Sequence, residues 1–199
     1  MPTSVVIKLT MAPGEWRRWR PLLWQGFRLE VEVGVSIEGL LIGELGINRE
    51  FVENRVRTVF LNGCPVDELS TAIVEEGSQM ALGGSMPGMV GIAMQRHSPA
   101  GFVRQEITYP KAKTHRERKR GSITVRLFNE MAEVLGPLVL RRGIGLEAEA
   151  LKALWADPSG VLGVEMNGKA TTLDEVRKQL GMFEEATAKG VLLEVQAVE

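Results

Sequence analysis

Few residues of this sequence combine the types and spacings that catalysis requires. Cys64 is the only cysteine, and it lies between an Asn-Gly turn and a proline. A reactive thiol needs a cation or a helix N-terminus nearby to lower its pKa, and none adjoins Cys64 in sequence. His97 and His115 have no carboxylate or nucleophile at a spacing typical of a catalytic or metal site. We therefore expect no enzymatic activity and no cofactor.

A basic segment is the strongest charge feature. Residues 104–120 carry 7 basic and 2 acidic side chains, a net charge of +5, whereas residues 1–103 and 121–199 are mildly acidic, with net charges of −2 and −4. Cations in such a segment can bind phosphates in a salt-sensitive way, and the candidates are Arg116, Arg118, Lys119 and Arg120. No aromatic residues alternate with them for stacking on bases. A solvated linker, or a tether lying on acidic neighbouring surfaces, is therefore the favoured interpretation, and nucleic acid is a less favoured partner.

Tryptophan and arginine alternate between residues 15 and 24. Trp16 and Trp19 are three residues apart, so one helical turn would place both on the same face. Because Trp and Arg are enriched among the residues that dominate binding energy at interfaces, Trp16 and Trp19 are candidate partner-binding residues. A core helix with its arginines turned outward explains the pattern equally well.

A strip rich in Gly, Met and Pro follows the internal pair Gly83-Gly84. Methionine adapts to irregular surfaces, so Met86, Pro87 and Met89 are candidate contacts with a larger protein partner. The alternative is a covered loop between domains. Gly83 and Gly84 are also a candidate processing site, although a turn that uses glycine for its tolerance of positive φ is the simpler explanation.

Composition limits the class of protein. The chain has 199 residues, of which 44% are hydrophobic and 25% are charged, which allows a packed core. One cysteine excludes an intrachain disulfide and favours a reducing compartment. The N-terminus lacks the features of a signal peptide, and no apolar run reaches the about 20 residues that a membrane helix needs. We therefore expect a cytoplasmic protein with no membrane partner.

The elements that position these residues form two similar blocks. Residues 4–9 align with residues 122–127, and each block later reaches an Asn-Gly pair, Asn62-Gly63 or Asn167-Gly168, the strongest short hairpin signal. Pro65 restricts the first return strand to a short or edge position. In the second block, Gly136-Pro137 is predicted to stop a helix that Asn129 caps. Thr172 and Glu175 have the spacing of a capping box. The order of landmarks indicates a tandem duplication.

The predicted organisation is therefore a first domain over residues 1–103, a basic linker over residues 104–121 and a second domain over residues 122–199. Each domain has the order strand, excursion, strand, helix, strand, Asn-Gly turn and closing strand. This order is that of a ubiquitin-like β-grasp. The predicted fold class is α+β, with two tandem ubiquitin-like β-grasp domains joined by the basic linker.

Three segments resemble small sulfur-carrier proteins of the ThiS and MoaD type. Residues 59–66 and 74–82 are similar to the hairpin and following strand of that family, and residues 123–136 are similar to its opening strand and helix. Those carriers end in a free Gly-Gly, whereas this chain ends Gln196-Ala197-Val198-Glu199. The only Gly-Gly is internal, at Gly83-Gly84.

The resemblance implies a non-catalytic interaction protein. By this analogy it serves as a subunit or assembly partner of an enzyme that contains a molybdenum or tungsten pterin or transfers sulfur. A nucleic-acid-associated regulator that uses the basic linker and a sulfur carrier processed after Gly84 are the alternatives.

Overall fold

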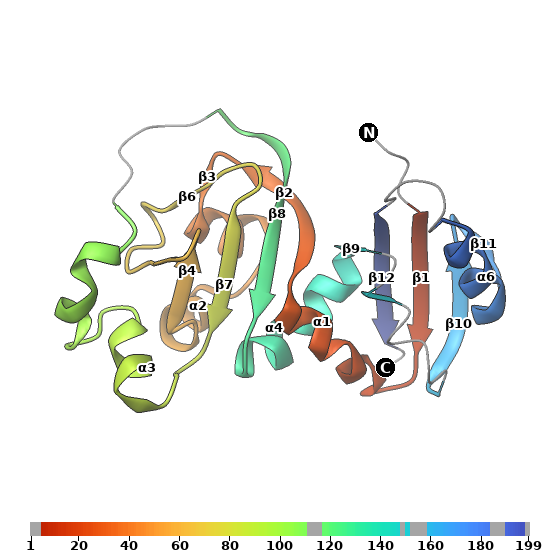
Figure 1. Ribbon diagram of the computed structural model, residues 1–199, viewed down its shortest axis with the longest axis horizontal. Coiled ribbons are helices and arrows are strands. Elements are labelled where there is room, and N and C mark those ends of the chain that lie inside the picture. Colours follow the sequence, from red (N-terminus) through yellow and green to blue (C-terminus); the bar gives the residue numbers. More distant parts are fainter. Residues whose placement is uncertain (1–4, 111–116, 148–149, 152–158, 184–189, 198–199) are drawn as a thin grey trace. The chain divides into compact units, whose positions relative to one another are not determined.

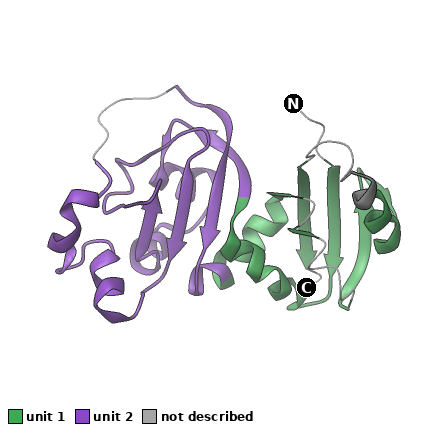
Figure 2. Ribbon diagram, viewed as in Figure 1, with its two compact units in different colours: residues 1–27, 133–199 green, residues 28–132 purple. Residues whose placement is uncertain are grey.

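The computed structural model describes residues 5–110, 117–147, 150–151, 159–183 and 190–197 (Figure 1). The chain forms two compact units of mixed helix and sheet, which Figure 2 distinguishes by colour. Unit 1 combines residues 1–27 with residues 133–199, and unit 2 consists of residues 28–132. The predicted domains, 1–103 and 122–199 with a linker at 104–121, divide the sequence at different places. The mixture of helices and sheet agrees with the α+β class.

Unit 1 contains a five-stranded sheet with the order β11-β10-β1-β12-β9. Strand β1 pairs antiparallel with β10 and parallel with β12, and β12 pairs antiparallel with β9. The strands are β1 (Val5–Met11), β9 (Ile144–Leu146), β10 (Val161–Met166), β11 (Lys169–Ala170) and β12 (Val191–Ala197). The helices are the 3-10 helix η1 (Glu15–Trp19), α1 (Arg20–Gln25), α6 (Leu173–Phe183) and all but the first three residues of α4 (Glu130–Arg142).

Unit 2 contains a five-stranded sheet with the order β2-β8-β7-β4-β5 and a separate pair, β3 with β6. Strand β7 is parallel to β8 and antiparallel to β4. The strands are β2 (Phe27–Val33), which begins at the unit boundary, β3 (Val35–Ser36), β4 (Thr58–Leu61), β5 (Cys64–Pro65), β6 (Ile73–Val74), β7 (Gln79–Gly83) and β8 (Lys119–Leu127). The helices are the π-helix η2 (Gly39–Glu44), α2 (Arg49–Arg55), α3 (Gly88–Met94) and the 3-10 helix η3 (Gly101–Ile107).

Alternating burial builds the core of each unit. Alternate residues of β1 are buried from Val5 to Met11, and alternate residues of β8 are buried from Gly121 to Leu127. Removing one such side chain from water stabilises the fold by about 1.5–3 kcal/mol, so strand register is strongly specified in both units.

Both Asn-Gly hairpins are confirmed. Asn62 and Gly63 have φ values of 52° and 81°, and Asn167 and Gly168 have φ values of 51° and 77°. Positive φ at both central residues is the requirement of a type I′ turn. The strand that carries Pro65 is short and lies at the sheet edge, as its missing amide hydrogen requires.

The predicted helix stop at Gly136-Pro137 is wrong, because α4 continues to Arg142. A Cβ added at Gly136 would lie 2.8 Å from Trp16 and 2.9 Å from Leu23, so α4 packs closely against the α1 region of the same unit. Such tertiary packing overrides the low helix propensity of the two residues. The predicted capping box is confirmed: the Glu175 N–H donates to the Thr172 hydroxyl, and the Thr172 N–H donates to the Glu175 carboxylate.

Candidate interaction surface

The segment between β7 and β8 exposes a cluster of large apolar side chains. Met89 is 85% exposed and Phe102 is 68% exposed. The α3 and η3 helices pack against one another within this segment, and Gly91 and Ala93 of α3 are buried. Isolated exposed apolar residues are ordinary, but several on one segment make that segment a candidate interaction site. The exposed apolar residues of this segment, called the apolar face below, are Met86, Met89, Val90, Ile92, Phe102, Val103 and Ile107.

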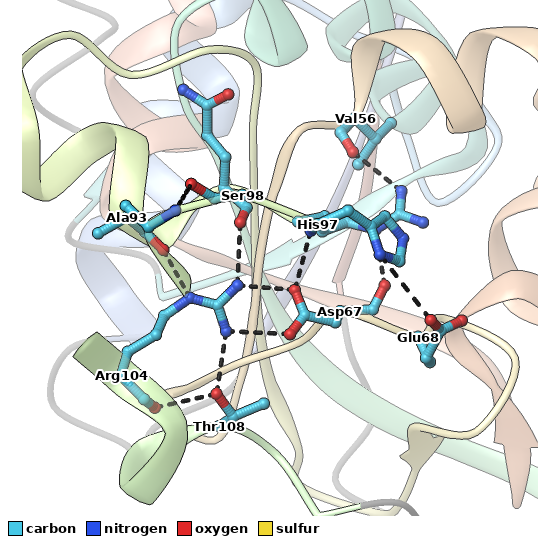
Figure 3. Close-up of polar contacts among 11 residues, drawn as sticks. Val56, Asp67, Glu68, Ala93, His97, Ser98, Arg104 and Thr108 are labelled. Carbon is cyan, nitrogen blue, oxygen red and sulfur yellow. Dashed lines mark hydrogen bonds and ion pairs between the residues drawn. The ribbon is translucent and has the colours of Figure 1, made fainter. Parts of the chain in front are cut away.

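A buried arginine fixes the segment that carries the apolar face. The Arg104 side chain is 1% exposed, and its guanidinium pairs with the Asp67 carboxylate through two bonds of 2.6 and 3.2 Å (Figure 3). The other three N–H groups donate to the Ala93 carbonyl, the Gln95 carbonyl and the Thr108 hydroxyl. All five donors are therefore satisfied, which is the condition for burying a guanidinium at low cost. Arg104 thereby joins η3 to the end of α3 and to Asp67.

The Asp67 carboxylate is the acceptor at the centre of this network. Partial burial opposes its ionisation, but the bonds from Arg104 and from the His97 N–H outweigh burial and lower the pKa of Asp67. The network is therefore ionised at neutral pH. His97 itself has a φ of 56°, a conformation that few residues other than glycine and asparagine adopt readily.

A second arginine anchors the same segment. Arg96 is half-buried, and it donates to the carbonyls of Asp67, Val52 and Val56, the last two from the end of α2. Burial lowers the pKa of Arg96. The chain is also held by two backbone bonds, from the Arg96 N–H to the Arg57 carbonyl at 2.7 Å and from the Tyr109 N–H to the Pro65 carbonyl at 2.8 Å. The apolar face is therefore displayed by a fixed scaffold.

The structure places the predicted strip on this surface. Pro87 and Met89 are exposed, and Met86 is 37% exposed. Pro87 immediately precedes α3, in extended conformation. The three residues are thus accessible to a partner. The same segment also exposes apolar residues of η3 that the sequence reasoning did not select.

Trp16 and Trp19, in contrast, belong to the core of unit 1. Trp19 is 1% exposed and its indole N–H lies 3.0 Å from the Met11 sulfur. Arg17 turns outward: it pairs with Glu133 at 3.2 Å, and its guanidinium lies 5.5 Å from the Trp16 ring centroid. The Arg18 side chain, in contrast, is only 18% exposed. Of the two alternatives for Trp16 and Trp19, burial therefore favours the core helix over the partner anchor, because a buried indole is not accessible to a partner.

Gly83 and Gly84, the candidate processing site, are both buried. The Gly83 carbonyl accepts the Arg57 N–H at 3.1 Å, and the Gly84 carbonyl accepts the Thr58 hydroxyl at 3.0 Å. This pair of glycines therefore closes a paired strand rather than forming a free tail.

The basic residues are brought to a cavity of about 640 Å³ in unit 2. Arg118, Lys119 and Arg120 line one side of it, and Arg116 lies outside the described residues. Carboxylates line the cavity as well: Arg120 pairs with Glu44 at 2.7 Å, and Arg118 pairs with Glu32 at 3.9 Å. The charge of the two arginines is thus largely balanced by the protein itself, which reduces their capacity to bind phosphate.

Asp67, Arg96 and Arg104 were not identified by the sequence reasoning. Asp67 and Arg104 are 37 residues apart, and no local pattern joins them. One sequence signal could have pointed to this segment as a surface. Residues 101–107 are rich in apolar side chains, follow the Met-rich strip and contain no run of charged residues.

Within the described part of the chain, no three His, Cys, Asp or Glu side chains gather in a way that could hold a metal ion. No helix among those residues has the length and apolarity needed to cross a bilayer.

Comparison with known proteins found no matching family model, no matching curated protein and no matching solved structure.

Proposed function

We propose that this chain is a non-catalytic interaction protein that docks a larger protein through the apolar face. The observation that carries the proposal is the combination of exposure and anchoring. Apolar side chains are exposed to solvent on a segment whose position is fixed by the Arg104–Asp67 pair. A fixed display loses little conformational entropy on binding, so a partner gains most of the free energy of apolar burial.

The proposal includes two ubiquitin-like β-grasp modules. The sheet order of unit 2 supports it, because a central parallel pair, β7 with β8, lies between antiparallel β4 and the outer β2, with helices η2 and α2 between β2 and β4. Unit 1 has the same components, a central parallel pair next to an Asn-Gly hairpin, but its parallel strands come from the two ends of the chain. Fold analogy alone supports function weakly.

By analogy with the sulfur-carrier family, the partner in this proposal is a cofactor-bearing or cofactor-assembling enzyme. The internal position of Gly83 and Gly84 favours docking over sulfur transfer, since neither glycine offers a free carboxylate. Their burial also restricts access by a peptidase. We therefore expect the native protein to be found uncut at Gly84, which intact-mass measurement tests.

The decisive experiment compares two exposed apolar surfaces of one chain. We expect the Met89→Ser and Phe102→Ser double variant to lose the protein that co-purifies with the native chain. The matched control is Leu162→Ser, because Leu162 is 63% exposed on β10 in unit 1, far from this segment in sequence. Co-purified material is assayed for molybdenum, tungsten and pterin fluorescence. Retention of the same partner by the double variant would exclude the apolar face as the docking site.

A further inference from the structure

The first strand of each repeat does not pair with the last strand of its own repeat. In a simple tandem duplication, the first strand of each repeat would pair with the last strand of the same repeat. The first strands are β1 and β8, which the repeat alignment makes equivalent, and the last strands are β7 and β12. The structure shows the opposite pairing: β1 lies parallel to β12, and β8 lies parallel to β7.

The two parallel pairs can be compared at one position of the repeat alignment. Lys8 and Arg126 are equivalent in the repeat alignment. Lys8 lies opposite Glu194 of β12, and Arg126 lies opposite Ala81 of β7. The buried residues alternate in the same phase on β1 and β8, so each strand can present the same face to a core.

The two hairpin asparagines show which strand lies beside each hairpin. In unit 2, the Asn62 side chain accepts the Gln79 N–H at 2.8 Å, which ties the hairpin to the last strand of its own repeat. In unit 1, the equivalent Asn167 accepts the Val6 N–H at 3.0 Å, so the hairpin is tied to β1 instead of β12. Strand β1 therefore occupies in unit 1 the position that β7 occupies in unit 2, and β12 occupies the position of β8.

We propose that the first strand of each repeat completes the sheet of the other repeat, so that the two repeats are interlocked by strand exchange within one chain. This inference uses the duplication but does not require the proposed docking function. It explains why unit 1 joins residues 1–27 to residues 133–199, whereas unit 2 includes β8 of the second repeat.

The exchange has a consequence for processing at Gly84. A cut there would release a fragment that contains β1 but lacks β8. Unit 1 would then lose the strand between β10 and β12, and the fragment would lack the parallel neighbour of β7. Neither product would be a complete module, so a carrier-sized domain cannot be released without dismantling both sheets.

Cross-linking tests the exchange by pairing the same four positions in two different combinations. In a Cys64→Ser background of the full chain, the exchanged pairs are Lys8→Cys with Glu194→Cys and Ala81→Cys with Arg126→Cys. The unexchanged pairs are Lys8→Cys with Ala81→Cys and Arg126→Cys with Glu194→Cys. All four positions are half-buried and face away from the core side of their strands. A thiol cross-linker that spans about 5 Å reaches only adjacent strands.

We expect peptide mapping to find the cross-link in most chains of the exchanged variants and only at background level in the unexchanged ones. Each substitution occurs once in each arm, so a folding defect caused by one residue would lower both arms alike. Far-ultraviolet circular dichroism and urea unfolding confirm that each variant is folded. The exchange is overturned if the unexchanged pairs cross-link, or if the exchanged pairs form only between two chains.

Discussion

At the scale of single residues, the Arg104–Asp67 pair governs the apolar face. Removing one partner of a buried ion pair leaves the other charge uncompensated, so we expect Arg104→Met to lower the free energy of unfolding by about 3 kcal/mol. Hydrogen exchange should rise first in residues 88–107, which Arg104 holds. The measurement is urea unfolding combined with peptide-resolved hydrogen exchange.

The matched control is Arg55→Met. Arg55 pairs with Glu130, but both side chains are substantially exposed, at 57% and 35%. Exposed pairs contribute about 0–1 kcal/mol, so this variant should be nearly neutral. Equal losses of unfolding free energy in the two variants would show that the buried ion pair of Arg104 contributes no more stability than the exposed pair of Arg55.

The lowered pKa of Asp67 predicts a dependence of stability on pH. A carboxyl whose pKa is lower in the folded state stabilises the protein above its unfolded pKa, and this contribution disappears as pH falls through the folded pKa. The difference in unfolding free energy between the native chain and Asp67→Asn should therefore be constant near neutral pH. This difference should shrink as pH falls below about 4, the ordinary pKa of an aspartate carboxyl. A difference that grows on acidification would contradict the assigned role of Arg104.

At the scale of elements, alanine substitutions at two glycines distinguish the cost of backbone strain from the cost of steric overlap. Gly34, between β2 and β3, and Gly63, in the first hairpin, have similar φ values of 82° and 81°. A Cβ at Gly34 would overlap the carbonyl oxygen of Glu117, whereas a Cβ at Gly63 meets nothing within 4 Å. Gly63→Ala should therefore cost about 1–2 kcal/mol, the penalty of left-handed backbone in an L-residue.

Gly34→Ala should cost more than Gly63→Ala, because the backbone at Glu117 must also move. Thermal unfolding of the two variants measures the difference directly. A smaller loss for Gly34→Ala would mean that the start of β8 is not held against the β2–β3 turn.

Elements that depend on neighbouring residues were predictable. The Asn-Gly hairpins, the short edge strand at Pro65 and the capping box at Thr172 follow from local chemistry. The continuation of α4 through Pro137 was not predictable, because the contact of Gly136 with Trp16 joins residues that are 120 positions apart. The same reason hid the Arg104–Asp67 pair. Of the surface, the sequence indicated Met86, Pro87 and Met89, while the role of Phe102 required knowledge of how η3 packs on α3.

At the scale of the whole molecule, the two units differ in chain continuity. Unit 2 is one continuous segment, residues 28–132, whereas unit 1 is assembled from segments on either side of it. When unit 2 is folded, its structure holds the ends of this intervening segment in place. When unit 2 unfolds, unit 1 must close a flexible loop of about 105 residues, which costs roughly 4 kcal/mol. Unit 1 should therefore depend on unit 2 more than unit 2 depends on unit 1.

Two equivalent core substitutions test this asymmetry. Leu61 of β4 in unit 2 and Leu193 of β12 in unit 1 are both fully buried. Replacing either by Ala should cost about 2–5 kcal/mol within its own unit. Because of loop closure, Leu61→Ala should also lower the urea midpoint of unit 1, whereas Leu193→Ala should leave the midpoint of unit 2 unchanged. Pulsed hydrogen exchange in urea reports each unit through peptides of β4 and β10. If Leu193→Ala lowers both midpoints equally, chain continuity is not what couples the units, since a contiguous unit 2 has no loop to close when unit 1 unfolds.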